Sequence, residues 1–398
     1  MNTNQVISTT IAPTAKTKVT TLTLVIDPGT SCTKSIHLKG RRGQPKYSIT
    51  SSVICPTAIA PVAEETYVKL PDDEQYYLVG DSAIQAKVQS SIRQLKSESL
   101  VPKTLGIIGQ IAREESLPNQ FKLKLTMLLP MSETNDREFI QTELLKALQD
   151  FNYSGVSYQI NESSLGFKPE GSGVYSYLSR AMSADTIKNQ TCAYLMFGYR
   201  NTSLLLIENG KLNHRSSHST DLGFYNYLDL VAEYSSGLYR HDIQKAIVSE
   251  AIYGVGENCQ QVVRGFTSQI RVEDLIRSTN PKYQERERAA ISAAIERADG
   301  EYWQLLSRWL REMLPPLGQL DRVIYCGGST SFIEAPIQQF FQNWNGELLN
   351  TDAMSIQMLE QLNLSPIAQS KFIEQYLPIR LADAWGEFVK LANFKIQL

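Results

Sequence analysis

Residues able to bind a phosphate gather between Asp27 and Lys34, in the segment Asp-Pro-Gly-Thr-Ser-Cys-Thr-Lys. A triphosphate needs backbone N–H groups directed at it, and Gly29 would let the backbone approach closely. Thr30 and Ser31 add hydroxyl donors. Lys34 can reach a phosphate as a point charge, and Asp27 can hold magnesium through water, because magnesium keeps much of its hydration shell. The alternative is an ordinary hairpin turn in which Asp27 caps the bend.

Two later segments fit the same chemistry. Glu170 stands between Pro169 and Gly171, where a carboxylate can position the water that attacks a γ-phosphate. The alternative is a solvated loop glutamate. Gly327 and Gly328 follow a predicted strand and can admit adenine and ribose against the backbone, although such turns are common in α/β proteins.

The elements that position these residues form a repeated pattern. A buried strand is predicted over 22–26 and a second over 34–38, with the Asp27 turn between them. The pattern returns as a strand over 193–196, a turn over 197–201 and a strand over 202–207. Asn209-Gly210 then favours a tight hairpin. This recurrence, roughly 170 residues apart, predicts two domains built on one plan.

Other segments complete an α/β pattern. We expect strands over 76–80, 123–129, 155–160 and 322–325, and helices over 140–151, 174–182, 284–313 and 378–391. Within 284–313, one apolar face is expected to be core: Tyr302, Leu305, Leu306, Trp309, Leu310 and Met313.

Bulk composition narrows the function classes. The 398 residues allow two domains, and 42% hydrophobic with 20% charged residues is typical of a globular protein. A net charge of −2 gives no electrostatic case for direct binding to nucleic acid or to a membrane. The five cysteines form no CxxC, which favours a reducing cytoplasm over a disulfide or zinc framework. Residues 1–20 are expected to be a disordered tail or, alternatively, a contact segment for a polymer or partner.

The order of these segments resembles the actin-like ATPases, closest to the plasmid-segregation filaments of the ParM (StbA) type and the archaeal actin-like proteins. Asp27, Gly29 and Lys34 match the first phosphate motif, Asp-x-Gly-x-x-x-x-Lys. Glu170 stands at the position of the catalytic glutamate. The remaining matches are looser: segments 77–83 and 128–130, Gly198-Tyr199-Arg200 with Thr202 as the second phosphate motif, Gly327-Gly328 as the adenosine motif, and Asp383–Gly386 as the second connecting segment.

The resemblance implies an α/β, actin-like (ribonuclease H-like, duplicated) two-domain fold with a central nucleotide cleft. Domain I would comprise 21–188 plus 370–398, and domain II 189–369. The cofactors would be ATP or GTP with Mg²⁺; Glu170 would be catalytic and Asp27 would hold the metal. The implied nucleotide contacts are Asp27, Gly29, Thr30, Ser31, Thr33, Lys34, Gly198, Tyr199, Arg200, Asn201, Thr202, Gly327, Gly328 and Ser329.

One position departs from the family pattern. The second phosphate motif normally begins with an aspartate two residues before its glycine, and Met196 stands there. The later acidic position of that motif is Ser203. Methionine is a soft ligand and magnesium prefers hard oxygens, so hydrolysis is expected to slow or change. Arg200 can partly compensate as a direct phosphate ligand.

The expected function is an ATP-dependent filament acting in plasmid or DNA segregation in the cytoplasm. It would associate with itself and with a DNA-binding adaptor. Met196 motivates an alternative, a structural filament or scaffold that hydrolyses slowly or not at all. A third alternative is a small-molecule kinase of the same superfamily, which phosphate release without an added acceptor would exclude.

Overall fold

The computed structural model describes residues 19–86, 99–182, 184–255 and 261–394. The predicted tail of residues 1–20 lies outside the described residues except for its last two. Among the described residues, no helix is both long and apolar enough to span a bilayer.

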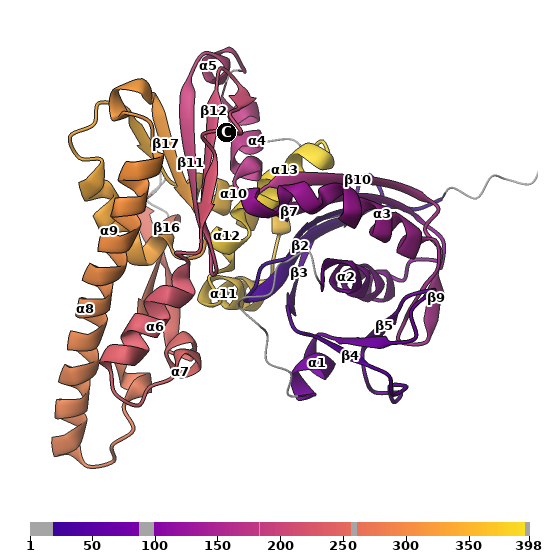
Figure 1. The fold of residues 1–398 in the computed structure, drawn as a ribbon, viewed down its shortest axis with the longest axis horizontal. Coiled ribbons are helices and arrows are strands. Elements are labelled where there is room, and N and C mark those ends of the chain that lie inside the picture. Colours follow the sequence, from indigo (N-terminus) through magenta and orange to yellow (C-terminus); the bar gives the residue numbers. More distant parts are fainter. Residues whose placement is uncertain (1–18, 87–98, 183, 256–260, 395–398) are drawn as a thin grey trace, which may run out of the picture.

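A five-stranded sheet forms the centre of the first half of the chain (Figure 1). In it, β1 pairs antiparallel with β2 and parallel with β7, and β7 pairs parallel with β10. The order is β10-β7-β1-β2-β3. The strands are β1 (Thr21–Asp27), β2 (Cys32–Lys39), β3 (Lys46–Ser51), β7 (Lys122–Leu129) and β10 (Glu162–Pro169).

The second half repeats this arrangement. Here β11 pairs antiparallel with β12 and parallel with β17, which pairs parallel with β18. The order is β13-β12-β11-β17-β18, with β14 also on β12. The predicted recurrence is thus confirmed for the strands around both turns. The strands are β11 (Thr191–Phe197), β12 (Thr202–Glu208), β13 (Lys211–Leu212), β14 (His218–Thr220), β17 (Arg322–Cys326) and β18 (Glu347–Leu349).

Helices cover both faces of each sheet. One core joins the inner faces of the two sheets through α4 (Ser172–Ala181), α10 (Asp352–Leu362) and α13 (Ala382–Leu391). The outer face of the first sheet packs on α2 (Leu100–Glu114) and α3 (Arg137–Leu148). The outer face of the second packs on α6 (Phe224–Tyr234), α8 (Pro281–Met313) and α9 (Thr330–Phe340). Burial on both faces explains why β1 and β11 read as apolar runs.

Smaller elements extend both halves. The first half adds a sheet of order β4-β6-β5-β8-β9, and the second adds the hairpin β15-β16. The strands of the small sheet are β4 (Ile54–Thr57), β5 (Tyr67–Lys69), β6 (Tyr76–Val79), β8 (Phe151–Tyr153) and β9 (Val156–Tyr158), and those of the hairpin are β15 (Ile247–Val255) and β16 (Gln261–Ile270). The remaining α-helices are α1 (Asp81–Gln85), α5 (Ala184–Lys188), α7 (Arg240–Lys245), α11 (Pro366–Glu374) and α12 (Leu377–Arg380). The short 3₁₀ helices are η2 (Met131–Asp136), η3 (Val272–Leu275) and η4 (Leu317–Gln319).

Four details differ from the sequence-based expectations. The helix expected over 378–391 is broken, because α12 ends at Arg380 and α13 begins at Ala382. The helix expected over 140–151 ends at Leu148, since Phe151 already begins β8. Leu305, expected in the core, is 37% exposed. Strand β10 was not expected, because it is a polar edge strand without an apolar run.

Candidate functional site

A cavity of about 530 Å³ lies where the two glycine turns meet. This volume is in the range of small-molecule sites in proteins. The residues of both predicted phosphate motifs and of the adenosine motif come together at it. Those that line it are Asp27, Gly29, Thr30, Ser31, Lys34, Glu170, Gly198, Tyr199, Arg200, Asn201, Gly327, Gly328 and Ser329.

The two turns have the same construction. A Cβ added to Gly29 would stand 2.7 Å from the Cys32 carbonyl oxygen, and one added to Gly198 would stand 2.8 Å from that of Asn201. In each turn the carbonyl three residues after the glycine closes the loop, and the Gly198 N–H donates to Asn201 across 2.9 Å. Only glycine fits either position without displacing backbone. Both turns therefore present backbone to the cavity, as a phosphate cradle requires.

The ladder registers of the two hairpins show which residues are equivalent. Asp27 pairs with Lys34 across β1 and β2, and Met196 pairs with Ser203 across β11 and β12. Each pair stands at the mouth of its turn. Met196 is therefore the structural counterpart of Asp27 as well as its counterpart in sequence spacing.

Charge is concentrated at the first turn. Lys34 forms an ion pair with the Asp27 carboxylate, and both side chains are largely buried. The Lys34 ammonium also donates to the Arg380 carbonyl at 3.2 Å. This pair fixes a cation and a hard-oxygen ligand beside the Gly29 turn. Both groups fit the phosphate and the magnesium of a nucleotide.

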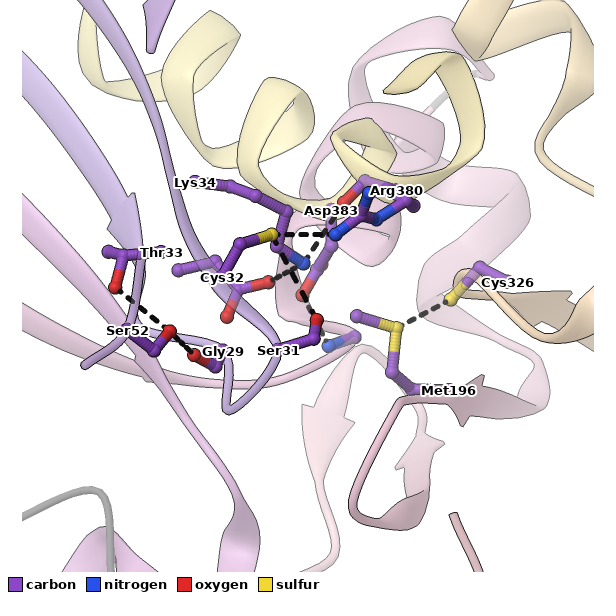
Figure 2. A network of polar contacts seen from close by, with 12 residues as sticks. Gly29, Ser31, Cys32, Thr33, Lys34, Ser52, Met196, Cys326, Arg380 and Asp383 are labelled. Carbon is purple, nitrogen blue, oxygen red and sulfur yellow. Dashed lines mark hydrogen bonds and ion pairs between the residues drawn. The ribbon is translucent and has the colours of Figure 1, made fainter. Parts of the chain in front are cut away.

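Two predicted nucleotide contacts do not line the cavity. Side chains alternate along β2, so Cys32 and Lys34 border the cavity while Thr33 does not. The Thr33 hydroxyl lies 3.4 Å from that of Ser52, whose hydroxyl donates to the Gly29 carbonyl (Figure 2). Thr202 donates to the Leu222 carbonyl at 2.6 Å. In this structure both threonines hold the shape of the turns from outside the cavity.

At the second turn, the position equivalent to the charged Asp27 is occupied by the uncharged thioether of Met196. Met196 is 6% exposed, and the Cys326 thiol donates to its thioether at 3.3 Å (Figure 2). Burial raises the pKa of the Cys326 thiol well above its usual value, and the nearby carboxylates of Asp383 and Glu170 raise it further. The thiol is therefore neutral. Ser203, opposite Met196, shares a hydrogen bond of 2.9 Å with Ser219.

Arg200 lines the cavity, but its guanidinium is already engaged. It forms a buried ion pair with Glu133 of η2, and its Nε donates to the Asn201 side chain at 2.6 Å. The pair joins the first half of the chain to the second turn. Sequence reasoning did not single out Glu133, because its partner is 67 residues away.

Glu133→Gln is expected to lower the free energy of unfolding by about 3 kcal/mol, because removing one partner of a buried ion pair leaves an uncompensated charge. Equilibrium denaturation in guanidinium chloride measures the change. The matched control is Asp229→Asn in the more exposed pair with Arg240, where a loss below about 1 kcal/mol is expected. Equal losses in the two variants would contradict this account of the Arg200 pair.

Glu170 is 8% exposed and follows β10 directly. The next turn, which starts α4, is held by Asp383 of α13. The Asp383 carboxylate accepts hydrogen bonds from the backbone N–H groups of Gly171 (2.8 Å), Gly173 (2.7 Å) and Val174 (3.2 Å). A Cβ on Gly173 would collide with the Asp383 backbone, so glycine is needed where α4 and α13 meet. The C-terminal helix thus fixes the backbone beside Glu170.

Burial raises the pKa of Asp383 to about 7, opposed by the Gly171 N–H and reinforced by the charges of Asp27, Glu387 and Glu170. The folded chain therefore binds this proton more tightly than the unfolded chain, whose carboxyl pKa is near 3.8. Stability contributed by the bound proton is lost as pH rises from about 4 to about 7.

Asp383→Asn removes this titration. As pH rises through this window, the unfolding free energy of the native chain is expected to fall by up to about 4 kcal/mol relative to that of the variant. Guanidinium denaturation of both proteins over a series of pH values measures it. A difference that stays constant with pH would show that Asp383 does not hold the proton.

An aromatic and aliphatic wall completes the cavity. Its side chains come from segments with no shared sequence signal, so they were not predicted. They include Phe224, Ile247, Phe332, Tyr376 and Leu377. Phe332, in the first turn of α9, packs against Phe224 in a tilted arrangement with ring centroids 4.7 Å apart. Such a wall can bury the apolar faces of a nucleotide base.

Only the first of the two turns offers a side-chain carboxylate that suits magnesium. Among the described residues there is no group of three or more His, Cys, Asp or Glu side chains placed to hold a metal ion. Magnesium bound with a nucleotide usually takes one or two carboxylates, with phosphates and water completing its shell. Asp27 provides such an oxygen ligand, whereas Met196 does not.

Solved structures match nearly the whole chain. The structure of the actin-like protein Alp7A matches with a TM-score of 0.57 and 13% identity, covering 94% of this chain and 96% of that one. An archaeal actin homologue, Ta0583, in complex with ADP matches with a TM-score of 0.55 and 14% identity, over 94% and 100%. The AlfA filament from B. subtilis plasmid pLS32 matches with a TM-score of 0.53 and 12% identity, over 93% and 98%. No protein-family model and no curated sequence matches the chain.

Proposed function

We propose that this chain, which has the actin-like fold, binds a nucleoside triphosphate with Mg²⁺ and assembles into nucleotide-dependent filaments. The observation that carries the proposal is the pair of equivalent glycine turns bordering one cavity, with Lys34 and Asp27 at the first. Two backbone cradles and one fixed cation suit a chain of phosphates.

Each residue of the cavity has a proposed role in binding or hydrolysis. Asp27 would hold magnesium, Lys34 would contact a phosphate, and the backbone of both turns would face the phosphate chain. Magnesium, when bound, neutralises charge that develops on the phosphates during hydrolysis. Glu170 positions the attacking water, and the Gly327-Gly328 turn receives the nucleoside. Either ATP or GTP satisfies these contacts.

Self-association and a plasmid role are proposed by analogy with proteins of the same fold. Those proteins include the ParM protein of pSK41, the AlfA filament from plasmid pLS32 and a ParM filament from Clostridium botulinum. A net charge of −2 favours a DNA-binding adaptor over direct contact with DNA. We place the filament in the cytoplasm and assign it no membrane partner.

Slow hydrolysis is favoured by one specific observation. The Met196 thioether and the Cys326 thiol occupy the position where a second carboxylate would help to orient the metal and the water. Loss of such an outer partner typically costs roughly 10–100-fold in metal affinity or activity. The filament would then be a long-lived, triphosphate-bound structure.

Sedimentation tests the proposal. ATP or GTP with Mg²⁺ should shift the native chain into the pellet above a critical protein concentration, and chelation of the metal should return it to the supernatant. Lys34→Gln is the matched variant that should stay in the supernatant. Phosphate release is followed in the same samples without an added acceptor. No nucleotide-dependent pellet over a wide range of protein concentration would reject the filament.

A further inference from the structure

Arg380, the last residue of α12, directs its guanidinium at the cavity. The group contacts two neutral partners. The Cys32 thiol lies 2.6 Å from Nη2 (Figure 2), and the Gln375 carbonyl lies 3.4 Å from Nη1. Arginine stays charged at all ordinary pH values, and a thiol is a weak acceptor. An anion in the cavity would therefore be a better partner than Cys32.

The side chain of Arg380 lies between the two motifs that a nucleotide would join. Cys32 closes the Gly29 turn with its carbonyl. On the other side, a Cβ added to Gly328 would stand 3.1 Å from Cγ of Arg380. The guanidinium thus lies between the first phosphate turn and the Gly327-Gly328 turn.

The backbone of Arg380 is anchored on both sides. Its carbonyl accepts the hydrogen bond from the Lys34 ammonium. Three residues later, Asp383 is held by the backbone at the start of α4. A fixed backbone with a partly exposed side chain lets the guanidinium change partner at little conformational cost.

The charge balance of the cavity calls for a second cation. Lys34 is already paired with Asp27, and Glu170 adds another carboxylate to the lining. A nucleotide brings several negative charges. Arg200 is bound to Glu133, so Arg380 is the cavity arginine whose contacts shown by the described residues are all neutral.

We propose that Arg380 is a phosphate ligand of the bound nucleotide, exchanging the Cys32 thiol for a phosphate oxygen when the nucleotide enters. The inference rests on the proposed nucleotide site and adds a ligand that no sequence motif indicated. Its guanidinium supplies the charge-assisted hydrogen bonds that Arg200 does not have free to give.

Titration calorimetry on the native chain and on Arg380→Gln tests this ligand. ADP or GDP is used, whichever the native chain binds, together with the corresponding nucleoside. The diphosphate should bind the variant roughly 10–100-fold more weakly, as expected for a lost charge-assisted hydrogen bond, with nucleoside affinity unchanged. Arg380→Lys should recover part of the loss. Arg308→Gln, on the exposed surface of α8, is the matched control and should bind as the native chain does.

The outcomes separate this inference from the proposed function. If the native chain binds neither diphosphate, the nucleotide site itself is wrong. If the native chain binds and Arg380→Gln binds equally well, only the role of Arg380 is overturned. An equal loss for diphosphate and nucleoside would also overturn it, because Arg380 would then contact the base or ribose. Unchanged unfolding midpoints show that the variants are folded.

Discussion

Lys34→Gln is expected to weaken nucleotide binding about 100-fold. Glutamine keeps a polar side chain at this position, but it removes the positive charge that contacts Asp27 and the Arg380 carbonyl beside the Gly29 turn. A charged hydrogen bond to phosphate is worth about 1.5–3 kcal/mol, and the variant also leaves the Asp27 charge unbalanced. Calorimetric titration with a nucleoside triphosphate and Mg²⁺ measures the loss.

Lys39→Gln, at the other end of the same strand, is the matched control for this prediction. Lys39 contacts the Glu115 carbonyl, far from the cavity, and its replacement should leave nucleotide affinity unchanged. Native-like affinity in Lys34→Gln would contradict the assignment of the first phosphate turn. Equal losses in both variants would point to a general effect on the fold.

Met196→Asp is expected to raise the rate of phosphate release about 10–100-fold at saturating Mg²⁺ and nucleotide. The register of β11 against β12 places this side chain at the position that Asp27 holds in the first turn. A carboxylate there would supply a second hard-oxygen group for the metal and its water. A phosphate-release assay with Mg²⁺ and nucleotide in saturating excess over the protein measures the rate.

Met196→Leu is the control, because leucine fills a similar volume without a ligand atom and should leave the rate unchanged. The aspartate variant is expected to be less stable without nucleotide, since its carboxylate would be buried near Glu170 and Asp383. Unfolding midpoints with and without Mg²⁺ and nucleotide report this cost. Brisk phosphate release by the native chain, unchanged in Met196→Asp, would contradict the slow-hydrolysis account.

The sequence predicted the parts of the fold that have strong local causes. Strands β1 and β11 are buried on both faces, so they appear as apolar runs, and the glycines of the two turns are required by backbone contacts within four residues. The departure from the family pattern at Met196 could be recognised in the sequence because this residue stands two positions before Gly198. The proposed domain boundaries stay a prediction.

The missed features depend on contacts between distant segments. Strand β10 is held by pairing with β7 and needs no apolar run of its own. Glu133 and Arg380 reach the site only because η2 and α12 pack beside the turns. Each of these residues is an ordinary charged residue in its local sequence. Spacing therefore predicted the phosphate turns but not the side chains that hold or extend them.

The central claim is that one nucleotide lies between the two glycine turns, and a structure of the native chain with ATP and Mg²⁺ tests it most directly. We predict phosphates against the backbone of Gly29 and Gly198, Lys34 in contact with them, and magnesium on the side of Asp27, away from Met196. A nucleotide bound elsewhere, or magnesium held beside the Met196 thioether, would contradict it.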